Sequence, residues 1–455
     1  MINSKHLNIL KAFLIILRIK FKKNIFRKKK IVLFPCEPGI NYSLSILPLY
    51  LAVYKADFNI EIFLSIRDIK YIPIYLLLGV HRFHVLLPAI FGFSSLKNYK
   101  KLFDYHKYLI PSILRFYLID SIESLDNKEK IIESLELKVS NLLKNFSRIN
   151  FANIKALFLS DYVYIPQGPI LEYVYNLHKN VDIYTFNLGH ISDTLVINKI
   201  ESLIDNRHPY SPPLNLYLNN LNSIKSGEEE KIIIKTRESL KSFYTNKDWF
   251  NYVGTSFYQT TTIDKNYSSL LSKKNNTHFA IFPHIYWDAS VAAGKDLFKN
   301  YRDWFESTVR YILKNTNSQI TIKDHPSNVF KLKNIGLNYS SPIYSFISQL
   351  PNEEKERIIY LTPDSKISTL SVIEKCDYVL TVRGTVGVEA CLFQRNVIFA
   401  GTGRFNNYNF GLFPKSVQEY YELIKQASEN IIPIEKENVL SAAVYLDTLW
   451  NNMTF

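Results

Sequence analysis

The chain has 455 residues, of which 47% are hydrophobic and 14% aromatic, a composition that excludes a wholly disordered protein. Its three cysteines form no CxxC pair, which argues against a disulfide framework and a structural zinc site and fits a reducing cytosol. The net charge is +14, but residues 1–30 hold ten basic and no acidic residues, so the other 425 residues carry only +4. A nucleic-acid-binding protein needs its cations spread over a folded face, and we therefore expect no nucleic-acid partner.

Residues 4–27 are predicted to form a basic amphipathic helix. Apolar side chains recur there at alternating spacings of three and four, as Leu7, Leu10, Leu14, Leu17 and Phe21. Such a helix binds an anionic membrane surface, or alternatively packs on the body of the protein with its basic face in water. No apolar run near it is long enough to span a bilayer, and no signal-cleavage site follows it. We expect a cytoplasmic protein, peripheral on the inner face of the cytoplasmic membrane if the first reading holds.

Residues 31–200 are predicted to form a first α/β domain, because short β-branched and aromatic runs alternate with helical stretches. The helical stretches are 42–54 and 128–146. The strand candidates are Ile31–Phe34, Ile60–Ser65, Ala156–Leu159, Tyr162–Ile165 and Asp182–Phe186. Residues 201–275 are polar and irregular in pattern, and we expect a linker or insertion there.

Residues 276–415 are predicted to form a second α/β domain with a parallel sheet, followed by C-terminal helices at 416–455. Its strands read as short apolar runs, which is typical of a sheet covered on both faces. They are His278–Pro283, Gln319–Lys323, Arg357–Leu361, Tyr378–Val382 and Val397–Ala400. The helices between them are Trp304–Lys314, Ile367–Glu374 and Thr385–Phe393. In such sheets ligands bind beyond the carboxyl ends of the strands, so the loops at that edge are the candidate site.

The stretch from Arg383 to Glu389 has the strongest local signal for a site. A strand is followed by the Gly384-Thr385 turn and a helix start, where free backbone N–H groups favour an anion. Thr385 and Glu389 share one helix face, so Glu389 is placed to accept hydrogen bonds from sugar hydroxyls. The alternative is purely structural, with Thr385 capping the helix and Gly387 allowing close packing.

Two further loops carry ionisable groups. Asp324-His325-Pro326 follows one strand, and His284 and Asp288 follow another. A histidine fixed at this edge donates to a phosphate or assists a leaving group. A structural histidine, with Asp324 as a surface charge, is the alternative. Convergence of three loops favours a site.

Charged groups from several segments are candidates to complete the site. Lys323, Arg383 and Arg404 are candidate phosphate-binding cations, although each also fits a solvated surface cation. Glu37, in the loop after the first strand, and Asp288 are candidates for the general base, and His190 is a further edge candidate. No DxD, phosphate-binding P-loop or GxGxxG motif occurs, so we expect no metal or other cofactor.

The second domain resembles the nucleotide-sugar domain of GT-B glycosyltransferases, in particular the capsule polysaccharide biosynthesis proteins that include bacterial Kdo transferases. The resemblance covers about residues 278–410 and depends on three segments: Lys323–Pro326, Arg383–Ala390 and Val397–Gly401. It implies two Rossmann-like domains facing a cleft. It also implies that His325, Pro326 and the Gly384-Thr385 turn bind the nucleotide phosphate and that Glu389 meets the ribose or sugar.

The function implied is metal-independent transfer of a sugar from a nucleotide-activated donor, with a CMP-sugar such as CMP-Kdo favoured. The acceptor would be a glycan or glycolipid in capsule or lipopolysaccharide synthesis. Two other hypotheses remain open. One is a phosphotransferase of the CDP-glycerol type, and the other is a non-catalytic scaffold for polysaccharide assembly.

Overall fold

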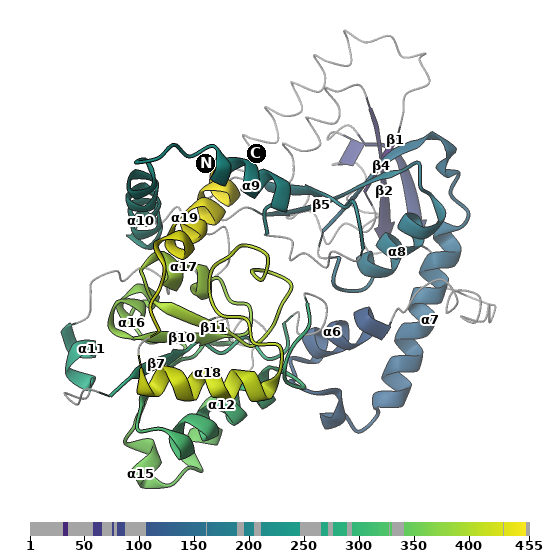
Figure 1. The fold of residues 1–455 in the computed structure, drawn as a ribbon. Coiled ribbons are helices and arrows are strands. Elements are labelled where there is room, and N and C mark those ends of the chain that lie inside the picture. The colour runs from purple at the N-terminus through teal and green to yellow at the C-terminus, as the bar shows by residue number, and fades with distance from the viewer. Residues whose placement is uncertain are drawn as a thin grey trace, which may run out of the picture.

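The computed structural model describes most of the chain from Ile31 to Asn451. The described residues are 31–34, 58–65, 75–76, 80–86, 106–160, 162–188, 195–203, 211–245, 265–271, 276–288, 294–326, 328–329, 341–430 and 432–451. The amphipathic helix expected at 4–27, the helix expected at 42–54, Glu37 and His190 lie outside them. Figure 1 shows two separate sheets, the six-stranded one at the upper right and the five-stranded one at the lower left.

The first sheet has the strand order β3-β2-β1-β4-β5-β6. Its first five strands are parallel, and β6 pairs with β5 in the antiparallel direction. The strands are β1 (Ile31–Phe34), β2 (Asn59–Ser65), β3 (Val80–Leu86), β4 (Ile154–Leu159), β5 (Asp182–Leu188) and β6 (Leu195–Lys199). The five parallel strands follow the order 3-2-1-4-5, which is the order of a Rossmann-type sheet.

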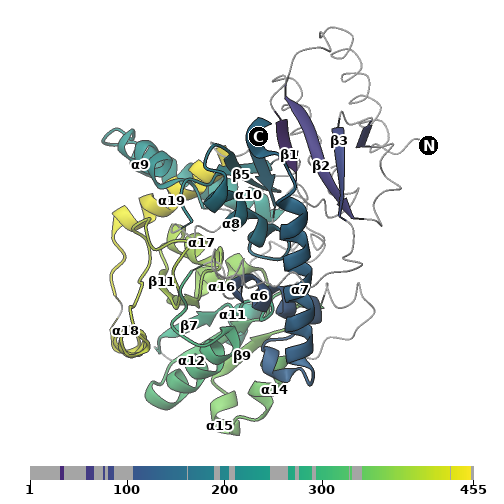
Figure 2. The same cartoon turned by 90° about the vertical axis from the view of Figure 1, so that its right-hand side faces the viewer.

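Among the described residues, three helices cover this sheet. They are α6 (His106–Tyr117), α7 (Lys128–Phe146) and α8 (Gln167–Leu177), with short 3-10 turns η2 (Ile122–Ser124) and η3 (Phe151–Asn153). Apolar side chains of α7, such as Val139 and Leu143, are buried with Leu157 of β4 and Ile183 of β5 in one core. Figure 2 shows α7 extending from the six-stranded half down beside α6.

The second sheet is entirely parallel, with the order β11-β10-β7-β8-β9. Its strands are β7 (His278–Ile281), β8 (Gln319–Lys323), β9 (Ile358–Leu361), β10 (Tyr378–Thr381) and β11 (Asn396–Phe399). Counted within this half, the order is again that of a Rossmann-type sheet. The prediction of two Rossmann-like α/β domains is therefore confirmed.

Side chains of the second sheet alternate between two buried cores, which explains its near-continuous apolar runs. On one face, Ile281, Ile322 and Leu380 pack against α12 (Tyr301–Asn315), α14 (Pro342–Ser348) and α18 (Val417–Glu429). On the other face, Val379 and Phe399 pack against α16 (Thr369–Lys375), α17 (Val386–Leu392) and α19 (Lys436–Asn451). A short helix, α15 (Asn352–Lys355), precedes β9. In Figure 1, α12 and α18 lie below the sheet and α17 and α19 above it.

Much of the segment expected as an irregular linker is helical and belongs to the second half. It contains α9 (Leu214–Asn222), α10 (Glu229–Thr245) and α11 (Lys265–Leu270). Tyr217 of α9, Leu240 of α10 and Tyr267 of α11 are buried in the same core as α19. The polar composition that suggested a linker comes from the solvent faces of these helices.

Three arginines bind the carboxyl ends of helices in this half. Arg357 donates to Leu313 O at 2.8 Å, beside the last turn of α12, and Arg395 donates to Glu374 O at 2.8 Å at the end of α16. Arg237 of α10 donates to Leu392 O at 2.7 Å, the last residue of α17. Each guanidinium meets carbonyls that lack helical partners and the negative end of the helix dipole. These cations stabilise the fold and are not available to a ligand.

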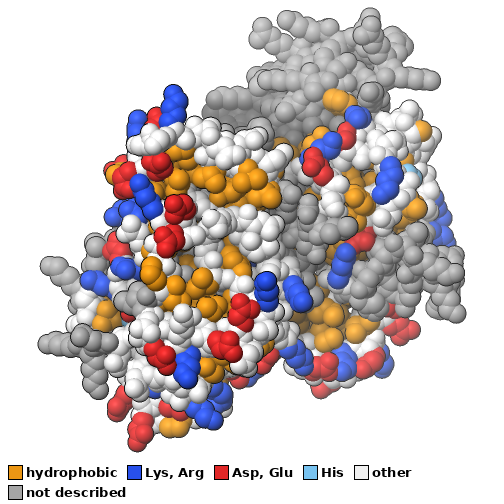
Figure 3. Space-filling model, viewed as in Figure 1, with side chains coloured by type: hydrophobic (Ala, Val, Ile, Leu, Met, Phe, Trp, Pro, Cys, Tyr) orange, Lys and Arg blue, Asp and Glu red, His pale blue; other side chains and the backbone are white. Residues whose placement is uncertain are grey.

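Charged groups do not gather by sign on the face drawn in Figure 3, where Lys and Arg side chains are interspersed with Asp and Glu. This agrees with the near-balanced charge of residues 31–455. Within the described ranges, no helix is both long enough and apolar enough to cross a membrane.

One strand predicted for the first sheet was wrong, and two strands were missed. Tyr162–Ile165 is not a strand, because β4 ends at Leu159 and the following residues leave the sheet before Pro166, which has no N–H to donate. The strand Val80–Leu86 was missed, since its arginine and two histidines interrupt the apolar run expected of a parallel strand. The antiparallel strand Leu195–Lys199 was missed as well.

Candidate functional site

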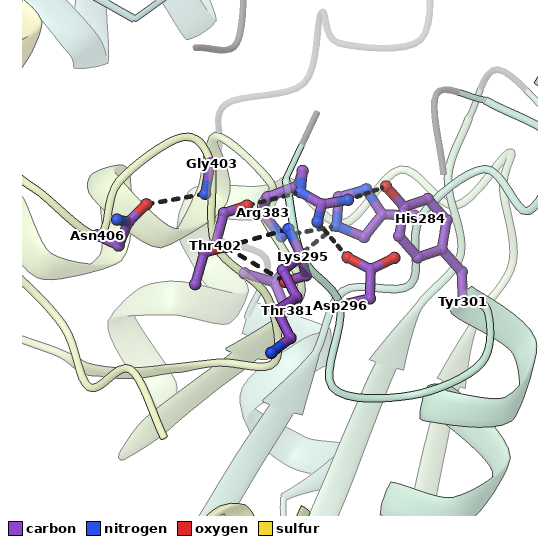
Figure 4. A network of polar contacts seen from close by, with 9 residues as sticks. All are labelled: His284, Lys295, Asp296, Tyr301, Thr381, Arg383, Thr402, Gly403 and Asn406. Atoms are coloured by element: carbon purple, nitrogen blue, oxygen red, sulfur yellow. Dashed lines mark hydrogen bonds and ion pairs between the residues drawn. The ribbon is translucent and has the colours of Figure 1, made fainter. Parts of the chain in front are cut away.

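Arg383 lies at the centre of a polar network at the carboxyl edge of the second sheet (Figure 4). Its side chain is buried, donates to Thr402 O at 3.2 Å and to Tyr301 Oη at 2.9 Å, and forms an ion pair with Asp296. Its charge is therefore compensated by a carboxylate. Arg383 ties together the loops that follow β7, β10 and β11, and its direct contact with a phosphate stays a prediction.

His284 is held by the backbone of Arg383. The Arg383 N–H donates to His284 Nε2 at 3.1 Å, and the ring stacks on Tyr301 with centroids 4.5 Å apart. A backbone N–H only donates, so Nε2 carries a lone pair and the imidazole proton lies on Nδ1. Burial, together with the nearby charges of Arg383, His325 and Arg404, lowers the pKa of His284 well below its usual value. The ring is thus a neutral hydrogen-bond donor through Nδ1.

The Gly384-Thr385 turn lies against this histidine. A Cβ at Gly384 would be 2.9 Å from Thr381 Oγ1 and 3.8 Å from His284 Cε1, so a side chain there would crowd the site. Thr385 precedes α17, but its hydroxyl makes no capping hydrogen bond. The alternative in which Thr385 serves as a side-chain cap is therefore not what the structure has.

Asp324 is buried and is not a surface charge. Its Oδ1 accepts hydrogen bonds from His325 N at 2.7 Å and from Asn328 Nδ2 at 2.8 Å. Its Oδ2 accepts hydrogen bonds from Ser341 Oγ at 3.0 Å and Tyr360 Oη at 2.9 Å. These four bonds fix the loop that carries His325, close enough to His284 for the charge on one ring to affect the other.

Lys323 occupies the last position of β8, and its ammonium donates to Ile367 O at 2.7 Å. Burial lowers the pKa of Lys323 to about 8. Lys323 is thus not a solvated surface cation, which was the alternative to phosphate binding. It also makes no contact within the Arg383 network.

Glu389 is buried on α17 and accepts a hydrogen bond from Tyr244 Oη at 2.6 Å through Oε2. Burial is the main reason that its pKa is raised, to about 7. Its other oxygen, Oε1, has no hydrogen-bond partner in the part of the chain that the structure describes. That oxygen is the one left to accept a hydrogen bond from a ligand.

Arg404 follows β11 and is 8% exposed. Its Nη1 lies 3.5 Å from Arg383 O, and its guanidinium lies 5.0 Å from the ring centroid of Phe405. Its Nε is buried and has no hydrogen-bond partner among the described residues. The Arg383 residue thus contacts two site groups through its backbone, His284 through its N–H and Arg404 through its carbonyl.

Asp288 joins the two halves of the molecule. It accepts a hydrogen bond from Tyr164 Oη at 2.5 Å, and Arg115 Nη1 lies 3.8 Å from the same oxygen. Tyr164 follows β4 and Asp288 follows β7, so loops at the carboxyl edges of both sheets meet here. Leu114 of α6 packs on Ile285 and Trp287 beside this contact. The carboxyl edges therefore face each other, as expected for a site between two domains.

Sequence reasoning missed Asp296, Tyr301, Thr402 and Tyr244. The first three fix Arg383, and the fourth fixes Glu389. Asp296 follows Gly294, whose φ is +151° and where a Cβ would collide with Thr402 O. A glycine ahead of an acidic residue was a usable signal for Asp296, whereas nothing in the sequence connects Tyr244 with Glu389, 145 positions away.

Residues 240–412 match the family model described as "Capsule polysaccharide biosynthesis protein". The chain resembles these proteins over that segment. The matched segment is less than half of the chain, but it contains every loop described above from His284 to Arg404, together with Tyr244. The resemblance expected from the three sequence segments is therefore confirmed. A comparison with curated proteins found no match.

Solved structures with related chain paths are all distant. The Thermosulfurimonas dismutans KpsC β-Kdo 2,4-transferase shares 10% identity over 65% of this chain and 81% of its own, with a TM-score of 0.38. Anabaena HepE, in complex with UDP, shares 13% identity over 92% of this chain and 95% of its own, with a TM-score of 0.29. A Neisseria meningitidis UDP-GlcNAc 2-epimerase shares 12% identity over 92% of this chain and 99% of its own, also with a TM-score of 0.29.

Proposed function

We propose that this protein is a glycosyltransferase that uses a nucleotide-activated sugar in the synthesis of capsule polysaccharide. The observation that carries the proposal is the coincidence of two features in residues 240–412. This segment matches the capsule biosynthesis family model, and it contains the converging polar loops at the carboxyl edge of the second sheet. Ligands of Rossmann-type sheets bind at that edge.

In this proposal the donor nucleotide binds to the second half. Its phosphate meets His325, Pro326 and the Gly384-Thr385 turn, and its ribose or sugar hydroxyls donate to Oε1 of Glu389. A CMP-sugar such as CMP-Kdo is the favoured donor, because KpsC is described as a Kdo transferase. HepE is described with UDP, so UDP-sugars are the donors to compare against.

The reaction breaks the bond between the anomeric carbon and the phosphate oxygen while the acceptor hydroxyl bonds to that carbon. Negative charge develops on the departing phosphate, and hydrogen-bond donors already in place lower the barrier by stabilising it. The acceptor hydroxyl proton passes to a carboxylate, for which Asp288 and Glu37 are the candidates. Asp288 lies where the carboxyl edges of the two sheets meet. We propose that the reaction needs no metal.

We also propose that residues 1–30 hold the enzyme at the inner face of the cytoplasmic membrane, beside a lipid-linked acceptor. Ten cations and an apolar helical spacing favour an anionic bilayer surface. Full-length protein should bind vesicles containing anionic lipid, and salt should weaken that binding by screening. Absence of binding at every salt concentration would reject the anchor.

The test of the function is a donor panel with purified protein and oligosaccharide acceptors. CMP-Kdo, other CMP-sugars, UDP-sugars and CDP-glycerol are compared by mass spectrometry of the products. We expect a sugar to be transferred from a nucleotide-sugar, with release of the nucleotide. Transfer from CDP-glycerol alone would replace the proposal with a phosphotransferase. Loss of polysaccharide in cells upon deletion of residues 1–30 but not with His325→Ala would favour a scaffold.

A further inference from the structure

Three candidate cations lie near the carboxyl edge of the second sheet, and the structure separates them. Arg383 is paired with Asp296, and Lys323 is turned to the carbonyl of Ile367. Arg404 is buried, with only 8% of its surface exposed. Even so, it forms no ion pair with any carboxylate in the described part of the chain. Arg404 is therefore the cation of the three that has, among the described residues, neither an ion pair nor a short hydrogen bond to a backbone carbonyl.

The surroundings of Arg404 compensate its charge only in part. Its close neighbours are the Arg383 carbonyl at 3.5 Å, the Phe405 ring and the Tyr445 hydroxyl. Its charge also acts on the buried carboxyl of Glu389, but burial raises the pKa of Glu389 to about 7, so that carboxyl is only partly ionised near neutral pH. Among the described residues, the Arg404 Nε has no hydrogen-bond partner. A buried cation without a partner costs stability, so a protein that keeps one gains something else from it.

The neighbouring donors suggest what that gain is. His284, whose Nε2 accepts from the Arg383 N–H, presents its Nδ1 proton, and Arg404 reaches the carbonyl of the same residue. Among the described residues, His284 Nδ1 has no hydrogen-bond partner. The Nε of Arg404 and the Nδ1 proton of His284 are thus two donors, beside one backbone residue, that have no acceptor among the described residues. An oxyanion complements such a set, because it accepts from both and neutralises the charge.

We infer that Arg404 is the residue that binds and neutralises the anionic phosphate of the donor, with His284 Nδ1 as a second, uncharged donor to it. This inference rests on the proposed function for the identity of the anion as part of a nucleotide-sugar. It assigns the binding charge to Arg404, and it gives Arg383 the different role of holding the surrounding loops together.

Arg404→Gln removes a buried charge that has no ion pair, so the variant without ligand should melt at or above the wild-type temperature. It should also bind phosphate-bearing ligands about 10- to 100-fold more weakly, the loss expected for one charged hydrogen-bonding partner. A residue with only a structural role would give the opposite result, with lower stability and unchanged binding.

The experiment measures the melting temperature of the full chain against inorganic phosphate, CMP, UDP and cytidine, because a ligand that binds only the folded state raises it. Arg310→Gln is the matched control, since that arginine also lies over a phenylalanine ring, at 4.8 Å from Phe346, but on α12. We expect the control to shift like the wild type. We expect Arg404→Gln to lose the shifts with phosphate, CMP and UDP and to keep any shift with cytidine.

The inference would be overturned if phosphate-bearing ligands raised the melting temperature of Arg404→Gln as much as that of the wild type. It would also be overturned if no phosphate-bearing ligand raised the melting temperature of the wild type. If Arg404→Gln melts well below the wild type, ligand binding is measured at a temperature at which both proteins are folded. Weaker binding of CMP with unchanged binding of cytidine supports the inference, and an equal change for both ligands overturns it. Failure of the proposed function is distinguishable, because it would leave these shifts intact while no nucleotide-sugar is turned over.

Discussion

The two halves of the molecule share one strand order but differ in what their carboxyl edges carry. At the edge of the five-stranded sheet, His284, Arg383 and Arg404 are joined through one backbone residue, and Glu389 lies on the helix that follows. At the edge of the six-stranded sheet, Ser160 and Gln167 satisfy each other by two hydrogen bonds of 2.9 and 2.6 Å. In the described residues, the same fold thus supports a charged site at one edge and a neutral, self-satisfied loop after β4 at the other.

This difference suggests a division of labour. A donor with a phosphate needs fixed cations and N–H groups, whereas an acceptor sugar presents neutral hydroxyls. The contact of Asp288 with Tyr164 brings a carboxylate of the charged half to the neutral half.

The largest effect is expected for His325→Ala. If His325 stabilises the leaving phosphate, the variant should lose roughly 100- to 1,000-fold in kcat/KM, because a positioned proton donor contributes about that much. The melting temperature should stay near the wild-type value, since Asp324 fixes the loop through the backbone N–H of residue 325, which alanine keeps. Steady-state kinetics with unchanged kcat/KM would remove His325 from the reaction.

Asp288→Asn and Tyr164→Phe separate chemistry from domain contact. If Asp288 accepts the acceptor proton, Asp288→Asn should lose about 100-fold in kcat. Tyr164→Phe removes only the hydroxyl that donates to the same oxygen, and a loss below about tenfold is expected. Equal losses in the two variants would show that Asp288 acts by joining the two halves.

Asp324→Asn tests whether the loop of the charged half depends on a buried acceptor. The substitution replaces one of two oxygens that each accept two hydrogen bonds, and it should lower the free energy of unfolding by about 2–4 kcal/mol. Asp364→Asn is the control, because Asp364 is exposed after β9, and it should change stability by less than about 0.5 kcal/mol. Similar values for both variants in urea unfolding would contradict the buried role.

A smaller effect, dependent on pH, is expected for Glu389→Gln. The pKa of Glu389 is raised to about 7 in the folded protein, so the folded state holds its proton more tightly than the unfolded state. Wild-type stability therefore falls as pH rises from about 4.5 to 7, and the loss persists above pH 7. Glutamine does not titrate, so the variant avoids this loss. Its free energy of unfolding should exceed that of the wild type by roughly 2 kcal/mol at pH 8 and by little at pH 4.5. A constant difference across this range would contradict a buried, titrating carboxyl group.

The two halves also differ in how much of them the sequence predicted. In the five-stranded half, all five strands were placed to within two residues at either end, because both faces are buried and the apolar runs are continuous. In the six-stranded half, β3 was missed because Arg82, His81 and His84 hid its pattern. Tyr162–Ile165 was misassigned because buried aromatic side chains in a loop resemble a strand.

Site prediction succeeded where loops follow strands and failed where partners are distant in the chain. The position of His284, His325 and Gly384 at one sheet edge follows from the order of strands alone. Of these two arginines, Arg383 forms an ion pair and Arg404 forms none in the described residues, and this depends on Asp296, which lies 87 residues from Arg383 in the chain. Such long-range contacts have no periodicity or spacing by which a single sequence reveals them.

The assignment of the donor to the five-stranded half is tested most directly by hydrogen–deuterium exchange of the full chain with and without CMP or UDP. Bound nucleotide should slow exchange in residues 282–288, 381–390 and 401–406, because the ligand orders the loops that it contacts. The loops of the six-stranded half should change little until an acceptor is added. Protection confined to residues 154–188, with none in the five-stranded half, would contradict the account.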